Sequence, residues 1–96
     1  MQEPTPLHRT MIAGIEAATR ADFEATGSSS VAVDGLGVPA EIWRKAARDV
    51  ARSLSRPVKT TATGGRLYAV LTDWPSNAAE MALQRAILLN AAAAET

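Results

Sequence analysis

Residues 58–72 read VKTTATGGRLYAVLT, two alternating runs of apolar and polar side chains on either side of Gly64-Gly65. Two glycines tolerate the positive φ angles that a two-residue hairpin turn requires. With the turn there, one face carries the pairs Val58–Leu71, Thr60–Ala69 and Ala62–Leu67, and the other carries Lys59–Val70, Thr61–Tyr68 and Thr63–Arg66. The first face is mostly apolar and the second mostly polar. A shift of one residue would mix the faces, so the sequence predicts this register as well as the hairpin.

Helical patterns lie on both sides of this hairpin. A proline at a first helical position opens a predicted amphipathic helix over 6–26, which ends at Gly27. Pro39 opens a second helix over 39–55, and Pro57 ends it because proline cannot continue the hydrogen-bond ladder. A third helix is predicted over 76–94.

The stretch between the first two helices is the least determined part of the pattern. Ser28, Ser29 and Ser30 form a turn-like cluster, and the alternation that follows predicts a short strand over 30–34. The pattern leaves open whether residues 27–37 contain a short helix in place of this strand.

These elements predict one small α+β domain across residues 1–96, in the order helix, short strand, helix, β-hairpin, helix, with residues 1–5 flexible. A chain of 96 residues supports one hydrophobic core and no second domain. Cysteine is absent, and no apolar stretch reaches the length of a membrane span. We therefore expect a cytoplasmic protein. Twenty alanines, and eight arginines against two lysines, indicate GC-rich codon usage, as in an actinobacterium or one of its phages or mobile elements.

Charge is segregated along the chain although ten basic and ten acidic side chains cancel. Residues 42–66 hold seven basic side chains and the single acid Asp49, a local charge of plus six. Arginines recur every fourth residue from Arg44 to Arg56, which places them on a slowly drifting ridge with a rise of about 6 Å per step. Such a ridge attracts phosphate, although it can also be only a solvated helix face.

From Gly37 onward, about 60 residues with a basic helix followed directly by a glycine-turned hairpin resemble winged-helix DNA-binding domains. The resemblance implies that the basic helix enters the major groove of duplex DNA and that the hairpin wing touches the backbone or minor groove. It also implies dimerisation through an added terminal helix. The chain departs from the family in the segment before the basic helix, where the family has a helix and this sequence predicts loop and strand. Another α+β domain of the same element order remains an alternative.

The candidate nucleic-acid contacts are cationic or hydroxyl side chains of the basic helix and the polar hairpin face: Arg44, Lys45, Arg48, Arg52, Arg56, Lys59, Thr61, Thr63 and Arg66. The third helix is apolar over more than one stripe, which indicates a partner surface that includes Met81, Leu83, Ile87 and Leu88. We expect duplex DNA and a second copy of the chain as partners. The alternative is a structural or interaction module that homodimerises or binds a host protein through this helix.

Enzyme and cofactor signals are weak. Residues 35–40, GLGVPA, fit the form of a dinucleotide-binding loop, but Pro39 removes an amide donor and no acid follows the next strand. His8 is the only histidine, so a histidine metal cluster is excluded and a serine-histidine-acid triad would depend on this one residue. We predict a non-enzymatic protein with no catalytic residues, no metal, no cofactor, no small-molecule ligand and no membrane partner.

Overall fold

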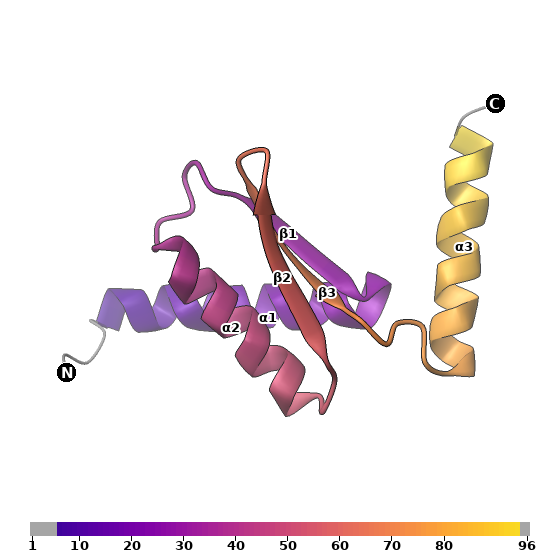
Figure 1. Cartoon of the computed structure of the whole chain (residues 1–96), viewed down its shortest axis with the longest axis horizontal. Coiled ribbons are helices and arrows are strands. Elements are labelled where there is room, and N and C mark those ends of the chain that lie inside the picture. The colour runs from indigo at the N-terminus through magenta and orange to yellow at the C-terminus, as the bar shows by residue number, and fades with distance from the viewer. Residues whose placement is uncertain (1–5, 95–96) are drawn as a thin grey trace.

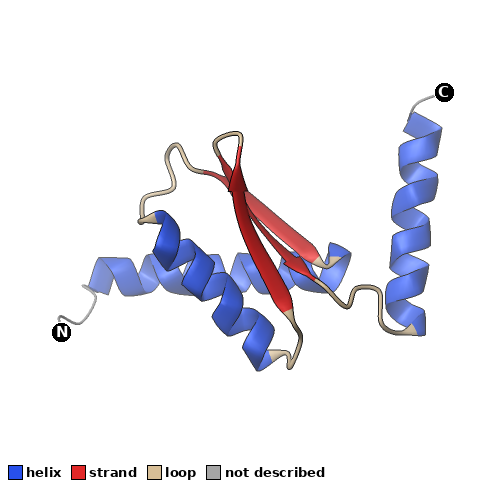
Figure 2. Ribbon diagram, in the orientation of Figure 1, coloured by secondary structure: helices blue, strands red, loops and turns tan. Residues whose placement is uncertain are grey.

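The computed structural model describes residues 6–94 and contains a three-stranded antiparallel sheet, drawn in red in Figure 2. Strands β2 (Val58–Thr63) and β3 (Arg66–Leu71) form the predicted hairpin, and β1 (Ser28–Ala32) pairs with the other edge of β3. All six predicted cross-strand pairs of the hairpin occur, from Val58 opposite Leu71 to Thr63 opposite Arg66. The expected flexibility of residues 1–5 concerns a segment outside the described residues.

Helices α1 (Pro6–Thr26) and α2 (Ala40–Ser53) pack on one face of the sheet, whereas α3 (Ala78–Ala94) lies off the sheet and contacts α1 (Figure 1). The core between the helices and the sheet contains Phe23, Trp43, Val50 and Leu67, each 1% exposed. Trp43, Ala46, Ala47, Val50 and Ala51 form the buried apolar face of α2. The chain is therefore a small α+β domain in the predicted order of elements.

Strand β1 begins two residues earlier than predicted and ends at Ala32, two residues before the predicted end, so Ser28 and Ser29, which were assigned to the turn alone, belong to it. The Gly27 N–H donates to the carbonyl of Phe23 at 3.0 Å and ends α1. The Gly27 carbonyl then accepts a 2.8 Å bond from Leu71 N–H, which brings the chain into the sheet at once. Pairing with β3 outweighs the weak strand preference of serine. Residues 33–39 form turns and bends without a helix, which resolves the question that the sequence left open.

Helix α2 ends at Ser53, two residues before the predicted end, in a Schellman motif. The Arg56 N–H donates to the Ala51 carbonyl at 2.9 Å, and the Ser55 N–H donates to the Arg52 carbonyl at 3.0 Å. Ser55 takes the left-handed position of this motif with a φ of 56°. This reversal points Arg56 away from the arginine ridge and toward the start of α3.

Helix α3 begins at Ala78, two residues later than predicted, because Asn77 is its N-cap. The Asn77 Oδ1 accepts a 2.9 Å bond from Glu80 N–H, and the Glu80 carboxylate accepts a 2.9 Å bond from Ser76 N–H. The first bond satisfies a backbone donor of the first turn, and the second ties the Glu80 carboxylate to the residue before the N-cap, an arrangement similar to a capping box. Among residues 6–94, no helix has the length and apolar character needed to cross a membrane.

Candidate nucleic-acid interface

The outward face of α2 carries four cationic side chains, because the opposite face is buried against α1 and the sheet. Arg52 and Lys45 expose 79% and 68% of their side chains, and Arg48 exposes 43%. Arg44 is less accessible, at 31%, because its Nε donates to Thr60 Oγ1 on the adjacent strand β2 at 3.1 Å. The four side chains therefore lie on one face of α2, as their spacing in the sequence predicts, and this face is the basic surface of the helix.

Two acids of α2 lie within this basic surface. Glu41 approaches Arg44 at 3.1 Å and Arg48 at 3.9 Å. Asp49 lies between Lys45, at 2.8 Å, and Arg52, at 3.3 Å. Four cations and two acids leave this face with a net charge of plus two. Ion pairs this exposed contribute little to stability, so the arginines can exchange these carboxylates for other anions at small cost.

A shallow open depression of about 500 Å³ lies beside the last turn of α2. Arg48, Arg52, Ser55, Arg56 and Val58 line it. Arginine forms paired hydrogen bonds with phosphate oxygens, and a serine hydroxyl can donate a third bond. The depression therefore has the size and donors for a phosphate group. Ser55 was not among the residues predicted from sequence, although a serine two residues before Pro57, at a helix end, was a usable signal.

Arg56 lies at the edge of this depression, but two carboxylates engage its guanidinium. Its Nε donates to Asp73 at 3.0 Å, and its Nη1 and Nη2 donate to Glu80 at 2.6 and 2.9 Å. These bonds raise the pKa of Arg56 and lower the pKa of Glu80 to about 2, while partial burial opposes both shifts. The guanidinium also lies over the Trp74 ring, 6.0 Å from its centre. Arg56 thus connects α2, the end of the hairpin and α3.

The hairpin residues predicted to bind nucleic acid lie on the other face of the sheet from α2. Thr60 faces α2, so the alternation of β2 places Lys59, Thr61 and Thr63 on the open face. Lys59 and Thr61 line a second depression with Tyr68, Val70 and Thr72. Arg66 lies on the same face, opposite Thr63, and donates to Ser30 Oγ on β1 at 3.1 Å. The predicted site therefore divides into an α2 surface and an open sheet surface.

The net positive charge around residues 42–66 is smaller in the folded protein than the sequence of this segment indicates. Glu41, Asp73 and Glu80 lie outside residues 42–66, yet each forms an ion pair with an arginine of that segment. When these three acids are counted, the plus six of the segment becomes plus three. The remaining positive charge is concentrated on α2 and on the two hairpin cations.

The apolar side chains predicted as a partner surface lie on two sides of α3. Leu83 and Ile87, 42% and 39% exposed, share a side with the half-buried Glu80 and Gln84, whereas Met81 and Leu88 are 58% and 59% exposed. Leu89, 64% exposed, lies next to Leu88. The helix is apolar on most of its circumference, which is typical of helices that are covered by a partner.

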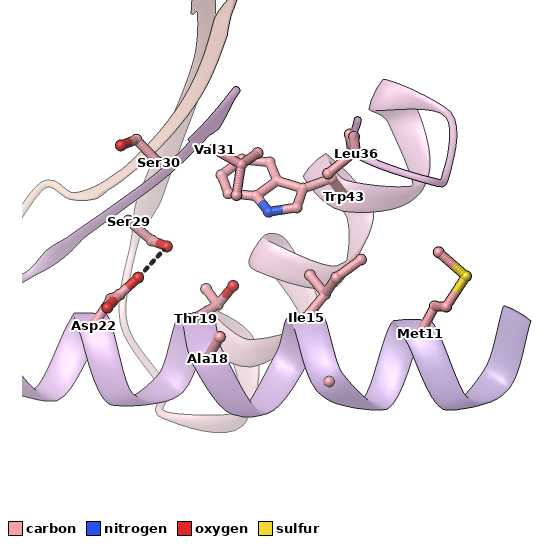
Figure 3. A pocket seen from close by; sticks show the side chains of 11 residues that line it. Met11, Ile15, Ala18, Thr19, Asp22, Ser29, Ser30, Val31, Leu36 and Trp43 are labelled. Carbon is pink, nitrogen blue, oxygen red and sulfur yellow. Dashed lines mark hydrogen bonds between the residues drawn. The ribbon is translucent and has the colours of Figure 1, made fainter. Parts of the chain in front are cut away.

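A groove of about 450 Å³ runs between α1, β1 and the loop that precedes α2 (Figure 3). Met11, Ile15, Val31, Leu36 and Trp43 form much of its lining. At one end, the Asp22 carboxylate accepts a 2.6 Å hydrogen bond from Ser29 Oγ. In the described part of the chain, no group of three or more histidine, cysteine or acidic side chains could hold a metal ion.

Comparison of the chain with protein-family models, with curated proteins and with solved structures finds no match.

Proposed function

We propose that this protein is a small, non-enzymatic, cytoplasmic DNA-binding protein with a winged-helix-like arrangement. In this proposal α2 is the recognition helix, the β2–β3 hairpin is the wing, and the ligand is duplex DNA. A regulatory role in a phage or mobile element of a GC-rich bacterium belongs to the same proposal and rests on composition alone.

One observation carries the proposal: the exposed face of α2 presents Arg48 and Arg52 beside an open depression that also offers the Ser55 hydroxyl. Phosphate contacts supply most of the sequence-independent affinity of DNA-binding proteins, and arginine is the side chain best suited to them. Lys45 and Arg44 extend the basic surface toward the start of α2. Arg56 has no part in the proposed contact because Asp73 and Glu80 already bind its guanidinium.

The order of elements also supports the proposal, with one departure from winged-helix domains. The basic helix leads directly into a hairpin with Lys59 and Arg66 on its polar face. Residues 33–39, where the family has a further helix, form turns. The proposal therefore rests on α2 and the hairpin and does not include a complete helix-turn-helix.

Fluorescence anisotropy with a random-sequence duplex at several salt concentrations tests the proposal. Each phosphate contact lowers log K by about 0.9 per unit of log salt, so the four α2 cations contribute roughly −3 to −4 to the slope, and contacts by Lys59 and Arg66 bring it to roughly −5. Absence of measurable binding at low salt would exclude DNA as the ligand.

Paired variants locate the contact. We expect Arg48→Glu with Arg52→Glu to abolish binding and leave the fold intact, because both side chains are exposed. Arg52→Gln is compared with the control Arg20→Gln, because each change removes one exposed arginine that makes one hydrogen bond. Arg52 donates to Asp49, and Arg20 donates to Ser53. Only Arg52→Gln should weaken binding. Equal effects of these two changes would contradict a contact at α2.

A second candidate function is self-association through α3, for which the exposed Met81, Leu88 and Leu89 provide the specific observation. Apolar side chains this accessible, lying together on one helix, mark an interaction surface. Light scattering after size exclusion should give twice the 10.1 kDa mass of one chain. A monomer at high concentration would exclude homodimerisation and favour docking to a different protein.

A further inference from the structure

Each copy of the chain contains both an apolar helix and an apolar groove that its own fold leaves uncovered. The groove follows α1 from Met11 to Asp22, and the side chains of Val31, Leu36 and Trp43 face it from above α1 (Figure 3). Gly14 and Ala18 form its wall on α1 and have no long side chains, so another helix can approach closely.

The most exposed apolar side chains of α3 form one stripe. Met81, Leu88 and Leu89 are 58%, 59% and 64% exposed, and their spacing places them on the same side of the helix. Arg85 belongs to this stripe, four residues after Met81 and three before Leu88. It is exposed, and no ion pair links it to another residue of the described chain.

Helix α3 is held away from the groove of its own chain. The bonds between Arg56 and Glu80 tie the first turn of α3 to the segment that follows α2, and Trp74 packs against Gly27 at the end of α1. From there α3 extends outward, while the groove continues toward the start of α1 (Figure 1).

Charge and length are complementary between the two surfaces. Asp22, at one end of the groove, accepts a hydrogen bond from Ser29 but has no cationic partner among the described residues. Arg85 is the only cation of α3. With Arg85 at Asp22, an α3 antiparallel to α1 would direct Leu88 and Leu89 along the groove toward Met11. The groove spans twelve residues of α1, from Met11 to Asp22, a rise of about 17 Å that accommodates three turns of a helix.

We propose that α3 of a second copy occupies this groove and that the exchange is reciprocal, which closes a twofold dimer. The proposal rests on the self-association assigned to α3 and adds the surface that receives the helix. It is independent of DNA binding. Arg85 of each copy pairs with Asp22 of the other, Leu88 and Leu89 cover the end of the groove nearest Asp22, and the alanine-rich end of α3 continues along it toward Met11.

The test blocks the groove without changing α3. A Cβ at Gly14 would meet no atom within 4 Å, and an arginine favours a helix more than glycine does, so Gly14→Arg should fold normally. This variant places an unpaired charge in the apolar groove. We therefore expect the dissociation constant of the dimer, measured by sedimentation equilibrium, to rise roughly tenfold or more. Ala17→Arg, at an exposed α1 position that does not line the groove, is the matched control and should leave the dimer unchanged.

Charge exchange gives a second readout. Asp22→Arg and Arg85→Asp should each weaken the dimer by roughly three- to tenfold, and the double variant should recover most of the loss.

The outcomes separate this proposal from simple self-association. If Leu88→Glu dissociates the dimer while Gly14→Arg does not, α3 associates elsewhere and the groove proposal is wrong. A wild-type monomer at several hundred micromolar would overturn both. Normal circular dichroism of each variant excludes unfolding as the cause of dissociation.

Discussion

The Arg56 guanidinium and the Glu80 carboxylate meet at two points: Nη1 lies 2.6 Å from Oε2, and Nη2 lies 2.9 Å from Oε1. The Arg56 and Glu80 side chains are 16% and 13% exposed. The Nε of Arg56 donates a further hydrogen bond to the Asp73 carboxylate. The residues belong to different elements, since Arg56 follows α2 and Glu80 lies in the first turn of α3. This contact therefore determines where α3 leaves the body of the domain.

Removal of the Glu80 charge should destabilise the fold. Glu80→Gln preserves the shape but weakens the bonds to Arg56, and we expect the free energy of unfolding to fall by about 2–3 kcal/mol because the guanidinium is largely buried. Urea denaturation measures the change. Glu24→Gln, at an exposed position of α1, is the control and should change stability by less than about 0.5 kcal/mol. Similar values for the two variants would contradict a structural role for the ion pair.

The same contact predicts an acid-labile component of stability. The Arg56 bonds lower the pKa of Glu80 from 4.5 to about 2 in the folded protein. Because the folded-state pKa is lower, the pair stabilises the fold fully above about pH 4.5, and this contribution is lost as the pH falls toward 2. Chemical denaturation between pH 6 and about 2 should therefore show a steeper loss in wild type than in Glu80→Gln. Parallel curves would assign the acid sensitivity to other carboxylates.

Gly27 should be irreplaceable for two separable reasons. Its φ is +76°, and a Cβ at this position would overlap the Trp74 ring. Gly27→Ala should cost about 2–4 kcal/mol, the sum of backbone strain and displaced packing. Gly35→Ala is the matched control, because Gly35 has a φ of +75° but open space around it. Gly35→Ala should lower the free energy of unfolding by about 1 kcal/mol, as measured by thermal denaturation. Equal losses for the two variants would show that the Trp74 ring moves aside freely and would contradict the packing reason.

Replacement of Ser55 by glycine should stabilise the fold. It occupies the left-handed position of the α2 cap, with a φ of 56°, where glycine carries no steric penalty. Ser55→Gly should raise the free energy of unfolding by about 1 kcal/mol in thermal or urea denaturation. A loss of stability would mean that the hydroxyl makes a contact that outweighs the backbone strain.

The two hairpin cations test whether the wing takes part in DNA binding. Lys59→Gln and Arg66→Gln should each weaken binding about equally across sequences and reduce the salt slope by about 0.9. Thr72→Ala removes a hydroxyl from the depression that Lys59 lines and changes no charge, so it should leave the salt slope unaltered. If only the α2 variants alter the slope, the open sheet face lies outside the contact.

The hairpin was predictable to the residue because its information is local. Gly64-Gly65 permits the turn, and alternation from Val58 to Leu71 allows one register that separates apolar from polar side chains. The apolar face of α2 was equally readable from its helical period. Strand β1 was shifted by two residues because Ser28 and Ser29 have weak intrinsic preference and obtain their conformation from pairing with Val70 and Ala69.

The candidate site was predictable only in part. The spacing of Arg44, Lys45, Arg48 and Arg52 is a helical property and places them on one exposed face. The same spacing also included Arg56, whose carboxylate partners lie 17 and 24 residues further along the chain. No local pattern shows that contact, because it depends on the Schellman turn and on the position of α3.

Local periodicity and turn chemistry alone specify the α+β order, the hairpin register and a basic α2 in this protein. Long-range packing assigns Arg56 to an ion cluster, places Lys59 and Arg52 on different faces of the domain and leaves the α3 stripe and the α1 groove uncovered. The physical reason is the range of the interactions. The side of a helix or strand on which a side chain lies follows from the local backbone conformation, whereas the residues that it contacts depend on how elements distant in the sequence pack.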